Sequence, residues 1–158
     1  MRIGQGVDIH RFSDDPHRPL VLGGVVIEGG RGLGGHSDAD AVCHALADAV
    51  LGAVGLGDLG RHFPDSDPVW EGANSVALLT QVMEMAAGQG YRCANADCTI
   101  IADAPRLAPY TQAMVERLSP VLGAPVSIKA TRAEGLGALG RAEGIACMAV
   151  VLLETDHS

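Results

Sequence analysis

Apolar positions along the chain follow strand spacing in some segments and helix spacing in others. Residues 2–10 predict a strand that carries Asp8 and His10 on one face, because side chains two apart on a strand point the same way. Residues 20–28 predict a hairpin around Gly23-Gly24. Helical spacing of apolar residues predicts helices at about 38–54, 75–87 and 107–122. The remaining predicted elements are strands at about 91–102, 125–130 and 143–154, with a short helical turn before the last strand.

The order of these elements predicts one domain over residues 1–158, in the α+β (α/β layer) class. The expected architecture is mainly one four-stranded sheet with the helices on one face. We expect the other face of the sheet to pack against another copy of the chain. A long polar loop at 55–72 separates the first two helices, and Asn74 or Ser75 is the expected cap of the second.

Composition narrows the class of protein. Apolar residues make up 47% of the chain but aromatic residues only 3%, so small aliphatic side chains must fill the core. The net charge is -8 with no dense Lys/Arg cluster, which disfavours nucleic acid or an anionic membrane as a partner. The four cysteines form no CxxC pair and lie in apolar stretches, as reduced buried thiols do. Neither a signal peptide nor a membrane-spanning run is apparent, so we expect a cytoplasmic protein.

Two short motifs supply metal-ligand chemistry. Asp8 and His10 lie two apart on a strand, about 6–7 Å between Cβ atoms, a spacing that suits one ion but is equally common in a surface pair. His44 lies among apolar helix residues, where a hydrogen-bonded core histidine is the commoner interpretation. Asp40 or Asp48, one turn away, is expected to orient its second N–H. One oxygen and two nitrogen donors leave a tetrahedral position open, as in catalytic zinc sites.

Further polar segments suggest a phosphorylated ligand. The acidic loop at 57–68 is either a solvated turn or a set of acceptors for sugar hydroxyls. Thr131, Arg132 and Glu134 follow a strand and could hold a phosphate with a hard cation. Two G-x-G-x-x-G strings occur, but neither opens a βαβ unit, so a dinucleotide fingerprint is excluded.

Taken in order, these motifs resemble the 2-C-methyl-D-erythritol 2,4-cyclodiphosphate synthase family over essentially the whole chain. The segments that carry the resemblance are RIGQGVDIH, GGHSDADAVCHALADAVLGAVGLGDLG, HFPDSDP, TIIADAPRL and KATRAEGLGALGRAEGIA. The resemblance implies a homotrimer that packs through its sheets, with active sites between adjacent subunits. It also implies one zinc ion per subunit on Asp8, His10 and His44.

The implied substrate is 4-diphosphocytidyl-2-C-methyl-D-erythritol 2-phosphate. Its 2-phosphate attacks the β-phosphate, closing a cyclic diphosphate and expelling CMP, in the non-mevalonate isoprenoid pathway. A second ion, Mg²⁺ or Mn²⁺, is implied on the substrate diphosphate with help from Glu134. His36 matches a residue that stabilises the transition state, and so does the position of Arg132, where relatives carry a threonine.

The resemblance implies a larger set of substrate-binding residues, which come from five segments. They are Asp8, Ile9 and His10; His36 and Ser37; Asp58, Leu59, Gly60, Phe63, Pro64, Asp65, Ser66 and Asp67; Ala102, Asp103, Ala104, Pro105, Arg106, Leu107 and Ala108; and Thr131, Arg132, Ala133, Glu134 and Arg141. The segment 102–108 matches a cytosine pocket. Besides Arg132, the chain departs from the family at Ala39 (usually glycine), Arg106 (commonly lysine) and Ala138 (often aromatic).

Two other functions use the same residues. A zinc phosphohydrolase would need a general base beside the open metal position, for which Asp65 or His36 is available. A non-catalytic trimeric nucleotide-binding protein would account for Arg132 as a mark of lost chemistry.

Overall fold

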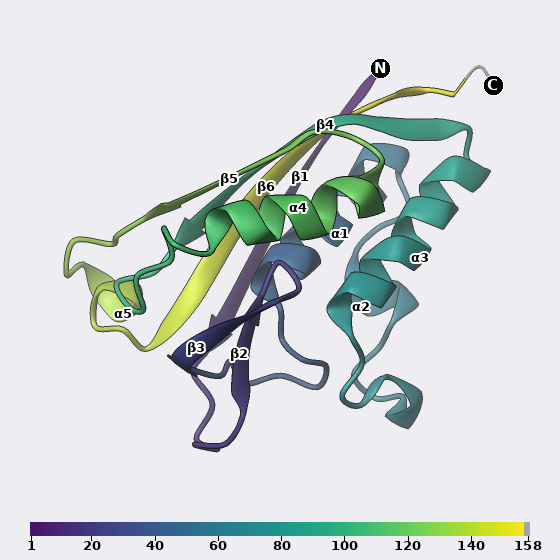
Figure 1. The fold of residues 1–158 in the computed structure, drawn as a ribbon. Coiled ribbons are helices and arrows are strands. Elements are labelled where there is room, and N and C mark those ends of the chain that lie inside the picture. Colours follow the sequence, from purple (N-terminus) through teal and green to yellow (C-terminus); the bar gives the residue numbers. More distant parts are fainter. Residues whose placement is uncertain (157–158) are drawn as a thin grey trace.

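The computed structural model describes residues 1–156, and Figure 1 shows the elements in chain order. The strands are β1 (Arg2–Arg11), β2 (Pro19–Leu22), β3 (Val25–Arg31), β4 (Tyr91–Ile101), β5 (Val126–Thr131) and β6 (Gly144–Thr155). The helices are α1 (Ala41–Val54), α2 (Leu59–His62), α3 (Ser75–Gly88), α4 (Thr111–Leu122) and α5 (Gly137–Gly140), with a 3₁₀ turn η1 at Pro68–Trp70.

Four strands form one sheet in the order β1-β6-β4-β5, and β2 pairs with β3 in a separate hairpin. The strand β6 runs antiparallel to both β1 and β4, whereas β5 is parallel to β4. The carboxyl ends of β1, β4 and β5 therefore lie at the same end of the sheet. The mixed α/β class and the four-stranded sheet predicted from the sequence are confirmed.

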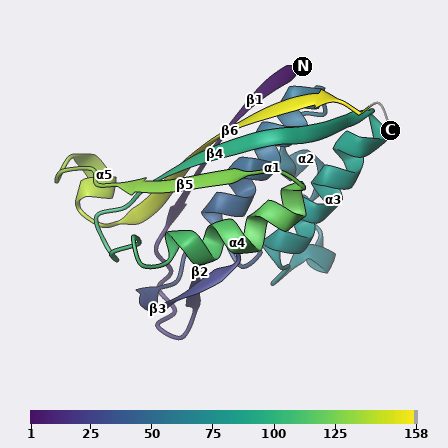
Figure 2. The ribbon, with the colours of Figure 1, turned by 45° about the horizontal axis from the view of Figure 1, so that its top comes forward.

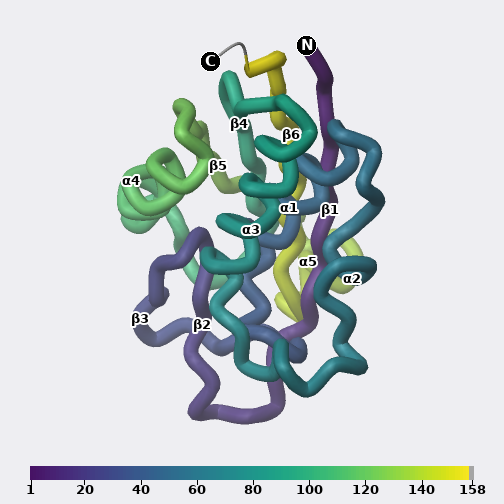
Figure 3. The backbone as a smooth tube through the Cα atoms, turned by 90° about the vertical axis from the view of Figure 1, so that its right-hand side faces the viewer, coloured from purple at the N-terminus to yellow at the C-terminus, as the bar shows by residue number. Residues whose placement is uncertain are grey.

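The three long helices lie on one side of this sheet, below the strands in Figure 2. Helix α1 packs on β1 and β6, and α4 packs on β5. Helix α3 lies alongside α1 (Figure 3). The prediction that all helices cover one face holds for these three, but α5 lies at the end of the sheet beyond β5 and β6 (Figure 1).

The opposite face of the sheet carries apolar side chains that the chain itself leaves uncovered. Side chains alternate along β1 and β6, so the residues that point away from α1 form one surface. Its exposed members are Ile3, Val7, Ile9, Met148 and Val150, and the exposed fraction of these residues ranges from 41% to 74%. An apolar surface of this kind is typical of a protein interface.

Helix α1 lies unusually close to β1 because that strand presents glycine to it. A Cβ atom on Gly4 would come within 1.8 Å of the Ala49 carbonyl oxygen, and one on Gly6 within 1.9 Å of the Ala45 carbonyl oxygen. No side chain fits at either position, so the helix backbone rests directly on the strand. This contact brings the first turn of α1 beside the end of β1.

Two predicted helix starts are wrong for local reasons. Helix α1 begins at Ala41 rather than near 38, because Asp40 caps it by accepting the amides of Val42 and Cys43. Ala39 just before the cap has φ of 56°, which excludes a right-handed helix there. Helix α4 begins at Thr111 rather than 107.

The predicted polar loop at 55–72 contains two short helical turns. Asp58 caps α2 through the amide of Arg61, and Asp67 caps η1 through the amide of Val69. Within residues 1–156, none of the helices is long and apolar enough to cross a bilayer.

Candidate active site

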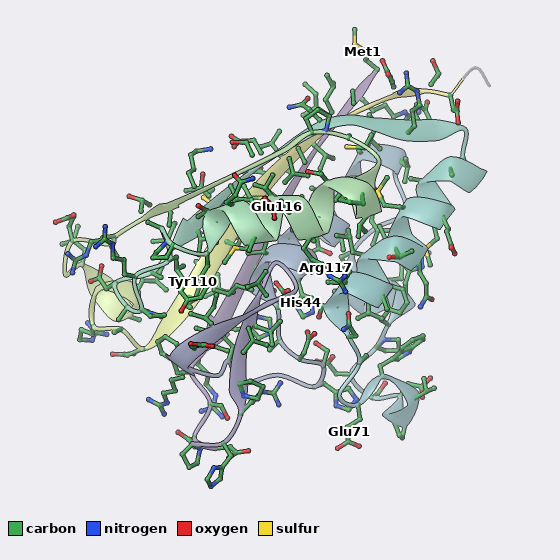
Figure 4. The ribbon with its side chains drawn as sticks, viewed as in Figure 1. Met1, His44, Glu71, Tyr110, Glu116 and Arg117 are labelled. Carbon is green, nitrogen blue, oxygen red and sulfur yellow. The ribbon has the colours of Figure 1, made fainter. Side chains whose placement is uncertain are left out.

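Asp8, His10 and His44 come together where β1 ends beside the start of α1. The Asp8 Oδ2 atom lies 2.6 Å from His10 Nδ1 and 3.7 Å from His44 Nδ1. The two imidazole rings have centroids 5.3 Å apart. One ligand atom from each residue lies within 4.8 Å of the others, and no other such group of three occurs in residues 1–156. His44, labelled in Figure 4, is a buried residue of α1.

The donor set of this cluster fits a zinc ion. Two imidazole nitrogens and one carboxylate oxygen are ligands that zinc takes in catalytic sites. Tetrahedral ligands at zinc distances are separated by about 3.3 Å, and the 2.6 Å and 3.7 Å distances lie on either side of this value. These two distances are compatible with Asp8 sharing one ion with each histidine.

The second nitrogen of His44 has a partner that the sequence did not predict. Its Nε2 lies 2.8 Å from Ser75 Oγ, at the start of α3, and 3.2 Å from Ser37 Oγ. The Ser75 hydroxyl in turn donates to Asp38 Oδ1. The prediction that Asp40 or Asp48 orients His44 is therefore wrong.

Asp40 and Asp48 have other structural roles. Asp40 is fully buried and accepts the backbone amides of Gly23 and Gly24 in addition to capping α1. Burial raises the pKa of Asp40, and these backbone hydrogen bonds work against that rise. Asp48 accepts the amide of Leu59 at 2.7 Å, and partial burial raises its pKa. Asp40 thus links the β2–β3 hairpin to α1 through hydrogen bonds, and Asp48 links α2 to α1.

A cavity of about 350 Å³ opens beside the Asp8, His10 and His44 cluster. Most of the residues predicted around the metal line it. The lining residues are Asp8, His10, Gly35, His36, Ser37, His44, Asp48, Asp58, Leu59, Gly60, Phe63 and Asp65. We call it the metal cavity.

Some residues predicted for substrate lie outside the walls of the metal cavity. Pro64, Ser66 and Asp67 are not among its lining residues, and Asp67 caps η1 instead. The side chain of Ile9 is 65% exposed and lies on the opposite face of the sheet, because it alternates with Asp8 and His10. Ile9 can face this cavity only through its backbone.

A second cavity of about 400 Å³ lies at the carboxyl ends of β4 and β5. It contains the predicted cytosine-pocket segment and part of the predicted phosphate segment. The lining residues are Ala102, Asp103, Ala104, Pro105, Arg106, Leu107, Ala108, Ala130, Thr131 and Arg132. We call it the base cavity.

The two predicted segments of the base cavity are joined through Asp103. Its Oδ1 accepts the amide of Ala133 at 2.9 Å, and its Oδ2 accepts the amide of Gly135 at 3.4 Å. The Arg132 Nε lies 3.8 Å from Asp103 Oδ1, while the Arg132 side chain is 71% exposed. Ala133 and Glu134 lie beside this cavity rather than in its walls, and Arg141 forms an ion pair with Glu143.

The chain matches known proteins over nearly its full length. The model of the YgbB family matches residues 1–154. The chain belongs to the YgbB family. It is 56% identical to the 2-C-methyl-D-erythritol 2,4-cyclodiphosphate synthase of Symbiobacterium thermophilum, over 97% of this chain and 98% of that protein. It is 54% identical to the synthase of the same name from Geobacillus kaustophilus, with the same coverage.

A solved structure of 2C-methyl-D-erythritol-2,4-cyclodiphosphate synthase in a CDP-bound form has the same fold. It superposes with a TM-score of 0.87 at 39% identity, over 97% of this chain and 100% of that one. The family resemblance predicted from the motifs is therefore confirmed.

Within this YgbB-family chain, the metal cavity and the base cavity have no lining residue in common. Asp8 and His10 lie on the edge strand β1, whereas Thr131 ends the opposite edge strand β5. Three strand spacings of about 4.8 Å separate those edges, or about 14 Å. The residues predicted to act on one substrate are thus divided between two places in a single chain.

Proposed function

We propose that this chain converts 4-diphosphocytidyl-2-C-methyl-D-erythritol 2-phosphate to 2-C-methyl-D-erythritol 2,4-cyclodiphosphate and CMP, as a cytoplasmic enzyme of the non-mevalonate isoprenoid pathway. The observation that carries this proposal is the cluster of Asp8, His10 and His44 at the edge of a cavity. Relatives more than half identical to the chain carry the name of this synthase. The whole of residues 1–158 would act as one domain.

In this proposal Asp8, His10 and His44 hold one zinc ion per subunit. Bound there, zinc would supply Lewis-acid polarisation and a fixed orientation for a phosphoryl oxygen. With three ligands from the protein, the ion could still take a further ligand from the substrate. The acidic residues Asp58 and Asp65, also in the metal cavity, would accept hydrogen bonds from hydroxyl groups of the substrate.

The reaction forms one phosphorus–oxygen bond and breaks another. An oxygen of the 2-phosphate attacks the β-phosphorus, and the bond from that phosphorus to the bridging oxygen breaks, so that CMP leaves with the oxygen. Negative charge builds up on the β-phosphoryl oxygens and on the leaving CMP. His36 in the metal cavity and Arg132 in the base cavity are the residues we assign to stabilising that charge.

The base cavity would hold the cytidine part of the substrate. Its 102–108 segment is largely apolar, so its backbone groups rather than its side chains would hydrogen-bond the edge of the base. Thr131 and Arg132 stand at the rim where a diphosphate would follow. A second ion, Mg²⁺ or Mn²⁺, would be held by phosphate oxygens and the single carboxylate of Glu134.

The division between two cavities supports a site shared by adjacent copies in a homotrimer. In a closed ring of copies, the β1 edge of one copy faces a different edge of its neighbour, so two different half-sites can meet. The exposed apolar face made by Ile3, Val7, Ile9, Met148 and Val150 would line the interior of such a ring. We therefore propose that each active site combines one copy's metal cavity with its neighbour's base cavity.

The test is to incubate the full-length protein with the diphosphocytidyl substrate, Zn²⁺ and Mg²⁺ and to identify the products by ³¹P NMR. The proposal predicts CMP and a cyclic diphosphate. CMP with an open-chain diphosphate would instead identify a phosphohydrolase. Tight CDP binding without turnover would identify a non-catalytic nucleotide-binding protein. Either of those results would overturn the proposal.

A further inference from the structure

The second nitrogen of His44 ends a series of three hydrogen-bonded side chains, of which His44 and Ser75 are buried and Asp38 is half-buried. His44 Nε2 lies 2.8 Å from Ser75 Oγ, and the Ser75 hydroxyl donates to Asp38 Oδ1. Ser75 is 1% exposed and His44 is 9% exposed. None of the three residues is adjacent to another in sequence, so this series of hydrogen bonds exists only in the folded protein.

The direction of each bond in this chain follows from the donors around Asp38. Its carboxylate accepts the backbone amide of Ser75 at 3.0 Å and that of Asp40 at 3.2 Å. Backbone N–H groups only donate, so both Asp38 oxygens act as acceptors and the Ser75 hydroxyl proton points to Asp38. A hydroxyl has one proton, so Ser75 can offer His44 only a lone pair. To form the 2.8 Å bond to Ser75, His44 must then carry its proton on Nε2.

We propose that Asp38 and Ser75 form a positioning relay that fixes His44 in the tautomer with Nε2 protonated and Nδ1 free to bind a metal ion. The other ring nitrogen faces the proposed metal ligands, because His44 Nδ1 lies 3.7 Å from Asp8 Oδ2. Metal-binding histidines are commonly held by a hydrogen bond from the second nitrogen to a carboxylate or carbonyl. Here a serine hydroxyl stands between the imidazole and the carboxylate.

The relay also fixes the loop that precedes α1. The Asp38 amide donates to the Ala73 carbonyl at 3.0 Å, and the Gly72 amide donates to the His36 carbonyl at 2.8 Å. The loop at 36–38 and the segment at 72–75 are therefore joined by two backbone hydrogen bonds next to the relay. Asp38 and Ser75 are held in register with each other before any ligand binds.

Ser37 is the alternative partner of His44, and it differs from Ser75 in its surroundings. Its Oγ lies farther from His44 Nε2, at 3.2 Å, and accepts the amide of Ala39 at 3.1 Å. No carboxylate is hydrogen-bonded to Ser37 Oγ among the contacts of residues 1–156. Its hydroxyl proton is thus not directed away from His44, and it cannot impose one tautomer.

This inference rests on the proposed metal site, but its first test needs neither metal nor substrate. Full-length protein labelled with ¹⁵N-histidine and stripped of metal should show His44 as the Nε2-protonated tautomer in long-range ¹H–¹⁵N spectra. Ser75→Ala should populate the Nδ1-protonated tautomer as well. Asp38→Asn places an amide beside Ser75, frees the serine proton to turn toward His44, and should do the same. An unchanged His44 tautomer in both variants would overturn the relay.

The second test measures zinc affinity by competition with a chelator. Ser75→Ala should lower the affinity by about 10- to 100-fold, in the range found for outer partners of metal ligands. The double variant with Asp38→Asn should lose little more than Ser75→Ala alone, because both act through one hydrogen-bond chain. Thr80→Ala serves as the control, because it removes another hydroxyl from α3, one that within residues 1–156 donates to the Val76 carbonyl.

The two tests separate failure of the relay from failure of the proposed function. Ser75→Ala with zinc affinity within twofold of wild type, at unchanged circular dichroism, would overturn the relay. If Ser75→Ala misfolds, two other variants test the relay. Asp38→Asn should lower the zinc affinity, whereas Ser75→Thr keeps the hydroxyl and should retain it. A wild-type protein that binds no zinc but shows the fixed tautomer would contradict the metal site and leave the relay standing.

Discussion

Gly6 lies so close to Ala45 that a Cβ atom on Gly6 would come within 1.9 Å of the Ala45 carbonyl oxygen. That contact sets the distance between β1 and α1, and so the distance between their functional residues. Asp8 and His10 follow Gly6 on the inner face of β1, and His44 directly precedes Ala45 on α1. The cluster of Asp8, His10 and His44 therefore depends on a glycine that is not one of its members.

Gly6→Ala should separate β1 from α1. Because the nearest atoms are backbone atoms that cannot rotate away, we expect a loss of about 3 kcal/mol in the free energy of unfolding, measured by urea denaturation. Zinc retention, measured by elemental analysis, should fall with it. Gly52→Ala on the same helix is the control, since its Cβ would meet nothing closer than the Gln5 carbonyl oxygen at 4.0 Å. Gly52→Ala should leave the free energy of unfolding unchanged or raise it. Equal losses of that free energy in Gly6→Ala and Gly52→Ala would contradict the role assigned to Gly6.

Ala142 holds a left-handed backbone conformation, with φ of 54°. An L-residue with a Cβ atom pays about 1–2 kcal/mol for this conformation, whereas glycine adopts it freely. Ala142→Gly should therefore raise the melting temperature, by about 2–4 °C for a gain of about 1 kcal/mol. Gly123→Ala, at the C-cap of α4 with φ of 64° and open space around its Cβ, should lower it. A lower melting temperature for Ala142→Gly would contradict the claim that the left-handed backbone of Ala142 destabilises the protein.

Asp48 should make stability depend on pH in the metal-free protein. Partial burial, with Asp58 and Asp8 nearby, raises its pKa above the ordinary 3.8. The folded state then holds the proton to higher pH than the unfolded state, so stability falls as pH rises through that interval. Asp48→Asn keeps an acceptor for the Leu59 amide and removes the charge.

Asp48→Asn should consequently melt at a higher temperature than wild type at pH 7, with the difference vanishing below pH about 3.8. Differential scanning calorimetry at several pH values on metal-free protein measures this. Asp14→Asn is a matched control, because that side chain is 83% exposed. If the melting temperature of Asp48→Asn exceeds that of wild type by the same amount down to low pH, the charge of Asp48 is not the cause of the difference.

The family resemblance implies a threonine that stabilises the transition state at the position of Arg132. The Arg132 side chain is 71% exposed, and within residues 1–156 its ion-pair partner is Asp103 at 3.8 Å, so replacing it should leave the fold intact. Arg132→Thr should show unchanged or higher turnover in a CMP-release assay, whereas Arg132→Ala should lose activity. A loss beyond about tenfold, or 1.4 kcal/mol, in Arg132→Thr would show that the guanidinium itself has become necessary.

The parts of the fold that follow from short-range patterns could be predicted from sequence. Alternation along β1 correctly put Asp8 and His10 on one face, and the position of His44 on the first turns of a helix was correct. Neither pattern contains the distance between the two elements. That distance comes from Gly4 and Gly6, whose importance is visible only when the backbone of α1 is placed against them.

The partner of His44 could not be predicted, because the helical pattern offers only residues on its own helix. Asp40 and Asp48 have the right spacing from His44, but backbone amides of other segments occupy both carboxylates. Ser75 was recognised only as a helix cap, a role that Asn74 fills. A hydrogen bond between residues 31 positions apart leaves no periodic trace in the sequence.

We propose that the metal cavity of one copy and the base cavity of its neighbour form one active site. Complementation tests it directly, with His44→Ala disabling the first half and Glu134→Ala disabling the second. Each variant alone should release almost no CMP. When the two are unfolded together in equal amounts and refolded, about a quarter of the sites in a closed ring combine two intact halves. The account predicts recovery of up to that fraction of wild-type activity, and mixed assemblies as inactive as the separate variants would contradict it.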